Sequence, residues 1–496
     1  MVPPPSSMYV AGAIGMPATT AAGAGVLILG GERFLHNYGP ADAGNTFLGQ
    51  QAGNFTMGGL NSWEGKYNTA TGYLSLHSNT TGFFNTASGY YSLSSNTTGY
   101  ENTASGYASL NFNTTGFYNT ASGFNSLCWN STGSANTANG YASLNSNTTG
   151  DGNTASGYQS LYSNTTGYSN TASGRESLYN NTTGSKNTAV GTRALQSQAY
   201  DNGGTPYASS NTAIGFEALY TNNPTGPTNG NQNTAVGTSA MYSNTTGADN
   251  TANGYHSLYT NSTGGYNTAS GLVSLTSNVT GSYNTASGSY SLQNNTTGVR
   301  NTASGNSAGS TNTTGSYNTF LGAGSDANAN NLTNATALGA NAVVDASNKV
   351  RIGDANVTVI EGQVAYTYTS DARLKENIRD LDLGLGFVLQ LRPVSFTMKQ
   401  GNGRTDMGFL AQDVEAVLGD DYNVLGIGGD QDRTLSLRGT DLIAPMVKAI
   451  QEQDATIRAQ QAQIDSQKAQ LEELRRIVQM LIRESAVEKT ARGNGT

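Results

Sequence analysis

Few residues in this 496-residue chain have side chains that could do chemistry, and their placement excludes the common catalytic sites. The three histidines, His36, His77 and His256, lie in or before a long repeat region, so the C-terminal region cannot build a Ser-His-Asp triad from its own residues. Cys128 has no second cysteine to pair with, and we expect it to be a small buried filler. No cluster has metal-ligand spacing, so we expect neither a metal nor a cofactor.

Paired carboxylates, which glycosidases need at a defined separation, are also hard to find. The acids of the repeats are scattered, without a pairing that sequence supports: Glu64, Glu101, Asp151, Glu176, Glu217 and Asp249. The net charge of -8, without a basic cluster, argues against nucleic acid as a partner. No stretch approaches the ~20 apolar residues of a membrane span, so we expect no membrane insertion.

A 17-residue repeat must position whatever site the chain has. Copies open at Asn68, Asn85 and onward to Asn187, and the count resumes at Asn233. Ala stands third, Gly fifth and Leu ninth in most copies, with polar residues between. This pattern predicts stacked rungs of two short strands each, with positive φ in the Asn-Thr-Thr-Gly turns, amide ladders at the Asn positions and an apolar column at the Leu positions.

One Ala, one Leu and one or two Tyr per rung is a thin core for a single chain. Three chains wound side by side would share one, and this argument predicts an obligate homotrimer. The register slips twice, by 7 and by 5 residues, around residues 196–210 and 221–232. We expect outward loops there, which are either receptor contacts or tolerated surface insertions.

A long helix follows near the C-terminus. Apolar residues recur in it every seven positions for about six heptads, which is typical of a coiled coil. The predicted core residues are Ile443, Ile450, Ile457, Ile464 and Leu471.

Composition and pattern together divide the chain into six predicted parts. The fold class is mainly β repeat, then a small α/β domain and a C-terminal coiled-coil helix. The parts are an N-terminal segment at 1–44, the β-roll shaft at 45–322, a β neck at 323–369, the α/β domain at 370–440, the coiled coil at 441–486 and a tail at 487–496.

Three blocks after the shaft carry a resemblance to a known family. They are residues 369–378 (Thr-Ser-Asp-Ala-Arg-Leu-Lys-Glu-Asn-Ile), residues 391–394 and residues 408–415. In this order, and followed by a terminal helix, they resemble the intramolecular chaperone auto-processing domain of phage tailspikes, endosialidases and tail fibres, over residues 370 to about 486. The resemblance implies that a trimeric domain guides folding of the shaft and then cuts itself off between Thr369 and Ser370, with Ser370 as nucleophile and Lys375 as its base.

The same resemblance implies supporting roles for Asp371, Asn377, Gly408, Phe409 and Gln412. A lysine accepts a proton near neutral pH only where burial favours its neutral form. Many relatives carry a His just ahead of the Gly-Phe block, where this chain has residues 405–407 (Thr-Asp-Met). The alternative to catalysis is that Ser370 is a helix N-cap and Lys375 a solvated side chain.

The repeats separately resemble the β-roll heads of trimeric autotransporter adhesins. We therefore expect a homotrimeric fibre or adhesin, in a virion or at a cell surface, that binds a host-surface glycan or receptor and acts as a single-turnover serine peptidase on itself alone. The first basic residue is Arg33, so no signal peptide is evident. The alternatives are a polysaccharide-degrading tailspike and a cellular trimeric adhesin that retains its C-terminal domain.

Overall fold

A computed structural model describes residues 25–364, 367–399, 403–419, 421–428 and 432–493. The chain divides after Asp354 into two compact units. Residues 1–24 of the predicted N-terminal segment lie outside the described residues.

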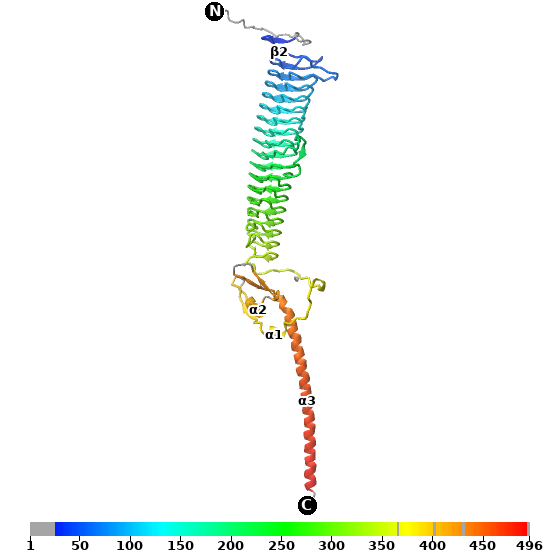
Figure 1. Ribbon diagram of the computed structural model, residues 1–496, viewed down its shortest axis with the longest axis vertical. Helices are drawn as coiled ribbons and strands as arrows, with labels where there is room; N and C mark the ends of the chain where they lie inside the picture. Colours follow the sequence, from blue (N-terminus) through cyan, green and yellow to red (C-terminus); the bar gives the residue numbers. More distant parts are fainter. Residues whose placement is uncertain (1–24, 365–366, 400–402, 420, 429–431, 494–496) are drawn as a thin grey trace, which may run out of the picture. The chain divides into compact units, whose positions relative to one another are not determined.

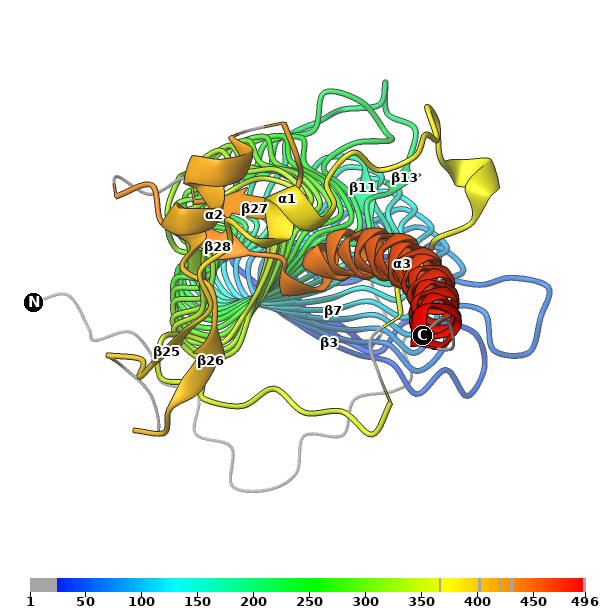
Figure 2. The ribbon, with the colours of Figure 1, turned by 90° about the horizontal axis from the view of Figure 1, so that it is seen from below.

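The first unit is a parallel β-solenoid, as the repeats predict, in which each turn of the chain lies over the turn before it (Figure 1). Seen along the stack, the rungs overlie one another (Figure 2). Neighbouring strands pair in parallel, threonine opposite threonine and alanine opposite alanine. The ladder consists of β3 (Thr46–Leu48), β4 (Thr69–Thr71), β5 (Thr86–Ser88), β6 (Thr103–Ser105), β7 (Thr120–Ser122), β8 (Thr137–Asn139), β9 (Thr154–Ser156), β10 (Thr171–Ser173), β12 (Thr188–Val190), β14 (Thr212–Ile214), β15 (Thr234–Val236), β16 (Thr251–Asn253), β17 (Thr268–Ser270), β18 (Thr285–Ser287), β19 (Thr302–Ser304), β20 (Thr319–Leu321), β22 (Thr336–Leu338) and β24 (Val350–Ile352).

Both ends of this ladder differ from the repeat tract. At the start, β1 (Leu27–Leu29) and β2 (Glu32–His36) form an antiparallel hairpin that pairs with β3. At the other end the ladder continues to β24, past residue 322, so parallel pairing extends into the predicted neck. A short parallel pair, β21 (Asp326–Ala327) with β23 (Val343–Val344), accompanies it.

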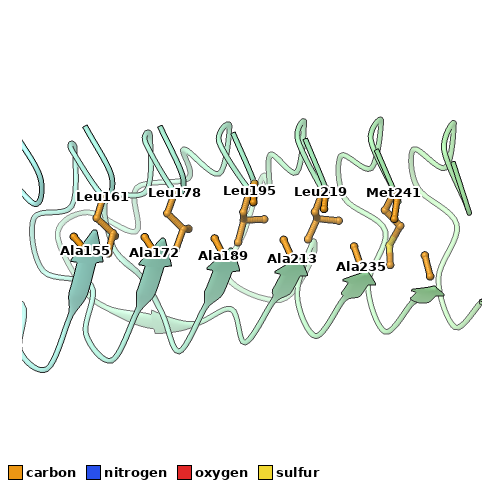
Figure 3. Packing of buried hydrophobic residues seen from close by; sticks show 14 of the residues in the cluster. Ala155, Leu161, Ala172, Leu178, Ala189, Leu195, Ala213, Leu219, Ala235 and Met241 are labelled. Carbon is orange, nitrogen blue, oxygen red and sulfur yellow. The ribbon is translucent and has the colours of Figure 1, made fainter. Parts of the chain in front are cut away.

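The core of the solenoid is a column of alanines facing a column of leucines. In Figure 3 Ala155 and Ala172 point from their strands toward Leu161 and Leu178 on the opposite wall. These four side chains are fully buried within one chain. A single chain thus already buries the column that the sequence argument expected three chains to share, and burial of each leucine stabilises its rung by about 1.5–3 kcal/mol. The homotrimer itself stays a prediction.

Two asparagine columns flank that core, and they confirm the predicted amide ladders. Asn102 donates from its backbone N and its side-chain Nδ2 to Asn85 Oδ1, both at 3.1 Å. Asn113 Nδ2 donates to Asn96 Oδ1 at 2.7 Å. Both amides also donate to the carbonyl of Gly116. Each buried amide thus finds partners in the chain, as burial of polar groups requires.

The rest of the rung differs from the prediction of a second strand. Most regular rungs have three left-handed residues that are not glycine, as at Tyr91 (φ 60°), Leu93 (φ 50°) and Glu101 (φ 53°), and this curls the chain into turns. The Asn-Thr-Thr-Gly turn, where we expected positive φ, has none at Gly99. Glycine is required there by space instead, since a Cβ on Gly99 would meet Asn96 Oδ1 and the Gly116 carbonyl.

The second unit has short elements around a small core. These are η1 (Ala372–Leu374), α1 (Leu385–Val388), β25 (Val394–Phe396), β26 (Asp406–Gly408), α2 (Ala411–Leu418), β27 (Leu425–Ile427), β28 (Leu435–Leu437), η2 (Gly439–Leu442) and α3 (Ile443–Gly493). β25 pairs antiparallel with β26, and β27 with β28. The buried core consists of Phe387, Val414, Leu418, Val424 and Leu442.

Helix α3 is the long helix that the heptads predict, beginning at Ile443 and ending at Gly493. It begins two residues after the predicted start and continues past the predicted end at residue 486. Among the described residues, no helix combines the length and the apolar character needed to cross a bilayer. The five predicted core residues all lie on α3 and are all exposed in the single chain.

Candidate active site

The residues that the resemblance marks as nucleophile and base lie together in the second unit. Lys375 Nζ donates a hydrogen bond to Ser370 Oγ at 2.8 Å. The turn η1 between them returns the chain on itself, because Leu374 N and Lys375 N donate to the carbonyls of Asp371 and Ala372. The five-residue spacing is thereby converted into direct contact.

Asp371 shapes this turn. Its Oδ1 accepts from Arg373 N at 2.9 Å, so Asp371, and not Ser370, is the N-cap of η1. The Arg373 guanidinium also forms a two-pronged contact with the carboxylate, with Nη2 to Oδ2 at 2.6 Å. These bonds from Arg373 hold the pKa of the Asp371 carboxyl below its ordinary value.

Sequence reasoning missed the role of Arg373. The available signal was the Asp-x-Arg spacing, which lets the arginine reach back to a cap residue over a single turn.

The other predicted supporting residues lie elsewhere in the unit. Asn377 is left-handed (φ 55°), just beyond the turn. Gly408 ends β26, where a Cβ would meet the Phe396 ring at ordinary contact distance, and Phe409 packs against the buried core. Gln412 lies exposed on α2. In the described part of the unit, no hydrogen bond or ion pair links these four residues to Ser370 or Lys375.

Ser370, Lys375 and their surroundings are exposed. Tyr368, Leu374 and Ile378 expose 70–81 % of their surface although they are apolar. The lysine and the serine are also exposed, so the desolvation that a lysine base needs does not come from one chain.

Two of the scattered acids of the shaft, Glu176 and Glu217, share an arginine partner. Glu176 and Glu217 both contact Arg193, at 3.3 and 3.2 Å. Burial acts to raise the pKa of Glu176, but hydrogen bonds from Arg175 and Arg193 outweigh it and lower that pKa. A carboxylate held ionised in this way is poorly suited to donate a proton as a glycosidase acid does.

Cys128 is the small buried residue that we expected. Burial raises the pKa of its thiol to about 11, and a thiol rather than a thiolate is a weak nucleophile.

Comparison with known proteins bears on the C-terminal unit alone. Neither the curated proteins nor the solved structures contain a match to this chain. Residues 370–421 do match a family model, Peptidase S74, described as chaperone of endosialidase. The match begins at Ser370 itself and includes Lys375, the three blocks from which the resemblance was drawn except for Thr369, and helix α2. The C-terminal unit of this chain therefore carries a chaperone of endosialidase domain.

Proposed function

We propose that this protein is a homotrimeric fibre of the phage tail-fibre type, whose C-terminal unit assembles three chains and then cuts each one before Ser370. The β-solenoid and the chaperone of endosialidase domain together support a tail-fibre-like protein. Such a fibre works outside a cell or as part of a virion.

The exposed apolar surface of the second unit supports assembly. Ile450 and Ile457 on α3 expose 65 % and 56 % of their surface, and the other core positions of the heptads are similarly open. An isolated helix with such a seam gains stability by packing against copies of itself. Long parallel ladders form slowly and expose strand edges, so a helix that first brings three chains together would limit misassembly.

The contact between Lys375 Nζ and Ser370 Oγ is the single observation that carries the cutting reaction. In the reaction a neutral Lys375 amine takes the hydroxyl proton, and Ser370 Oγ attacks the carbonyl carbon of Thr369. The C–N bond breaks as the Ser370 nitrogen takes a proton, which leaves an ester between Thr369 and Ser370 Oγ. Water then hydrolyses the ester to a Thr369 carboxylate and a free Ser370.

Assembly and cutting are coupled in this proposal. Ser370 and Lys375 are exposed in one chain, whereas a base of this kind needs burial, and the neighbouring apolar side chains would become buried between chains. Cutting would then follow assembly and trap the shaft kinetically in its trimer.

Mass spectrometry of the purified chain tests the reaction. The wild type should yield fragments of residues 1–369 and 370–496, whereas Ser370→Ala and Lys375→Ala should stay intact. The control Ser395→Ala removes an exposed hydroxyl from β25 and should cut like the wild type. A wild-type chain that stays whole after assembly would contradict self-cleavage. The fibre proposal would then depend on the measured oligomeric state alone.

A further inference from the structure

The first insertion in the shaft is folded back onto it. After β12 the chain leaves the rung and returns as β13 (Tyr207–Ala208), which pairs in parallel with β11 (Gly184–Ser185). Thr166 Oγ1, from two rungs earlier in the stack, donates to the Gly204 carbonyl at 2.8 Å. Asn202 N donates to Thr183 Oγ1 at 3.1 Å. These contacts fix the loop at residues 199–206 in place, unlike a loop tip that merely tolerates extra residues.

A hollow of about 460 Å³ lies between this loop and the wall of the shaft. Gly204 and Pro206 of the loop line one side, and Thr149, Asp151, Thr166 and Tyr168 line the wall. Its volume is within the range of about 300–1,000 Å³ that is usual for small-molecule sites.

The hollow lies where an aromatic column of the shaft stops. Phe83, Tyr100 and Phe117 stack on successive rungs with ring centroids 4.8 Å apart. The same position on the next two rungs holds Ser134 and Asp151, and Tyr168 follows one rung later. The neighbouring position, Gly152, places no side chain on this wall, and the space beside it is open, since a Cβ there would meet only Ser169 Oγ at 3.8 Å.

The lining combines groups that recognise a sugar. Tyr168 and Pro206 offer apolar faces, Thr149 offers a hydroxyl, and Thr166 Oγ1, which donates its proton to the Gly204 carbonyl, can still accept a hydrogen bond. Asp151 is the one charged residue among those that line the hollow, and Ser134 N donates to its Oδ1 at 2.7 Å. A carboxylate without a neighbouring cation in the lining accepts hydrogen bonds from hydroxyl or ammonium groups and repels an anion.

We propose that this hollow binds a neutral sugar or an amino sugar, with the ring against Tyr168 and a hydroxyl or amino group on Asp151. The inference rests on the proposed function, because it names the ligand that an adhesive shaft would bind. It makes the first insertion, and not the second at residues 221–232, the contact site for a glycan.

Binding of the full-length protein to immobilised oligosaccharides tests the inference. The probes are neutral glucose and galactose oligomers, glucosamine and N-acetylglucosamine oligomers, and sialylated oligomers. The wild type should bind a neutral or amino probe more tightly than the sialylated ones. Tyr168→Ala and Asp151→Asn should weaken that binding by tenfold or more, and Tyr290→Ala, which removes an exposed tyrosine elsewhere on the shaft, should leave it unchanged.

Thr166→Val, which deletes the hydroxyl that holds the loop at Gly204, provides a second variant and should also weaken binding. Urea midpoints equal to that of the wild type show that the variants are folded. Absence of binding to every probe, a preference for sialylated probes, or binding unchanged in a folded Tyr168→Ala would overturn the inference. The mass and the oligomeric state of the same preparations test the proposed function separately. If the protein binds the sugar but neither forms trimers nor cuts itself, the proposed function is wrong and the sugar site stands.

Discussion

At the level of single residues, the contact between Ser370 and Lys375 depends on a turn that other side chains hold. Asp371 accepts the Arg373 backbone N–H and pairs with its guanidinium, and this fork sets the direction of the chain into Lys375. Asp371 and Arg373 are therefore positioning residues for the proposed reaction, because neither contacts the reacting atoms.

Replacing Asp371 by asparagine tests that role. The amide keeps one acceptor for the cap but loses the charge that holds Arg373, so we expect cutting to slow by roughly two- to fivefold, as the loss of an exposed ion pair allows. Since the folded pKa of Asp371 is lowered, the wild-type turn keeps its stabilisation above the ordinary value near 3.9 and loses it as pH falls through the folded value. The variant should show no such acid step in its cutting rate, and Asp371→Glu should restore most of the rate.

A pH profile that Asp371→Asn leaves unchanged would remove the aspartate from this role. The amount cut should be followed from about pH 2 to 8 by mass spectrometry, so that the range crosses the lowered pKa of Asp371, with circular dichroism as the check that each variant is folded.

Sequence alone named Ser370, Lys375 and Asp371 as members of this site, but it predicted neither the role of Arg373 nor the geometry. Ser370 and Lys375 came from a family resemblance, whereas the Asp371–Arg373 fork required knowledge of a single turn. The backbone of the shaft shows the same limit. Leucine normally avoids the left-handed region, so nothing in the repeat indicated that Leu93 and its counterparts adopt it. Their conformation is set by hydrogen bonds to the next rung, such as Leu93 N to the Ser109 carbonyl at 3.0 Å.

At the level of elements, the amide ladder explains how an irregular rung fits into a regular stack. Where other rungs carry asparagine, the rung that begins at Asn187 carries Gln198. Its Nε2 donates to Asn181 Oδ1 at 3.0 Å, and its Oε1 accepts from Asn211 Nδ2 at 3.0 Å and Asn222 Nδ2 at 3.3 Å. The extra methylene gives the amide the reach to join the ladder on both sides of the insertion.

We therefore expect Gln198→Asn to destabilise the shaft although asparagine is the usual residue of the repeat. Gln198 is 1 % exposed, and the shorter amide would leave buried groups unpaired at about 1–3 kcal/mol each. The urea midpoint of the full chain, followed by circular dichroism, measures the effect. Gln293→Asn makes the same chemical change at a half-buried position and should shift the midpoint little. A Gln198→Asn chain as stable as the wild type would show that the ladder closes without the longer side chain.

The solenoid and the long helix could be predicted because each has a periodic sequence. The 17-residue spacing predicted the solenoid, and the heptads predicted α3 to within two residues at its start. The prediction of a second strand in each rung was wrong. Left-handed residues at the seventh and ninth positions turn the chain where the alternating pattern predicted an extended strand. The repeat pattern did not predict that the parallel ladder continues through β22 and β24. These rungs have a different sequence, but their strands still pair with the strand before them.

At the level of the whole molecule, the support for a trimer comes from the C-terminal unit and not from the shaft. The solenoid buries its alanines and leucines in one chain and needs no partner to do so. The second unit, in contrast, leaves Ile457, Ile464 and Leu471 between 44 % and 56 % exposed on a helix of 51 residues. If assembly depends on that seam, a shaft that is stable alone would still be brought into register by the helix.

Light scattering of the Ser370→Ala chain, which keeps both units joined, decides this point. We expect about three times the chain mass of 51.4 kDa. Ile457→Asp combined with Ile464→Asp places charges in two successive heptads of the proposed interface and should give single chains, because an unpaired buried charge costs far more than packing there returns. Ala455→Asp combined with Ala462→Asp adds the same charge at exposed positions of α3 outside the seam, and it should leave the trimer intact. A folded wild-type-like chain that scatters as one copy would contradict the trimer, and with it the coupling of cutting to assembly.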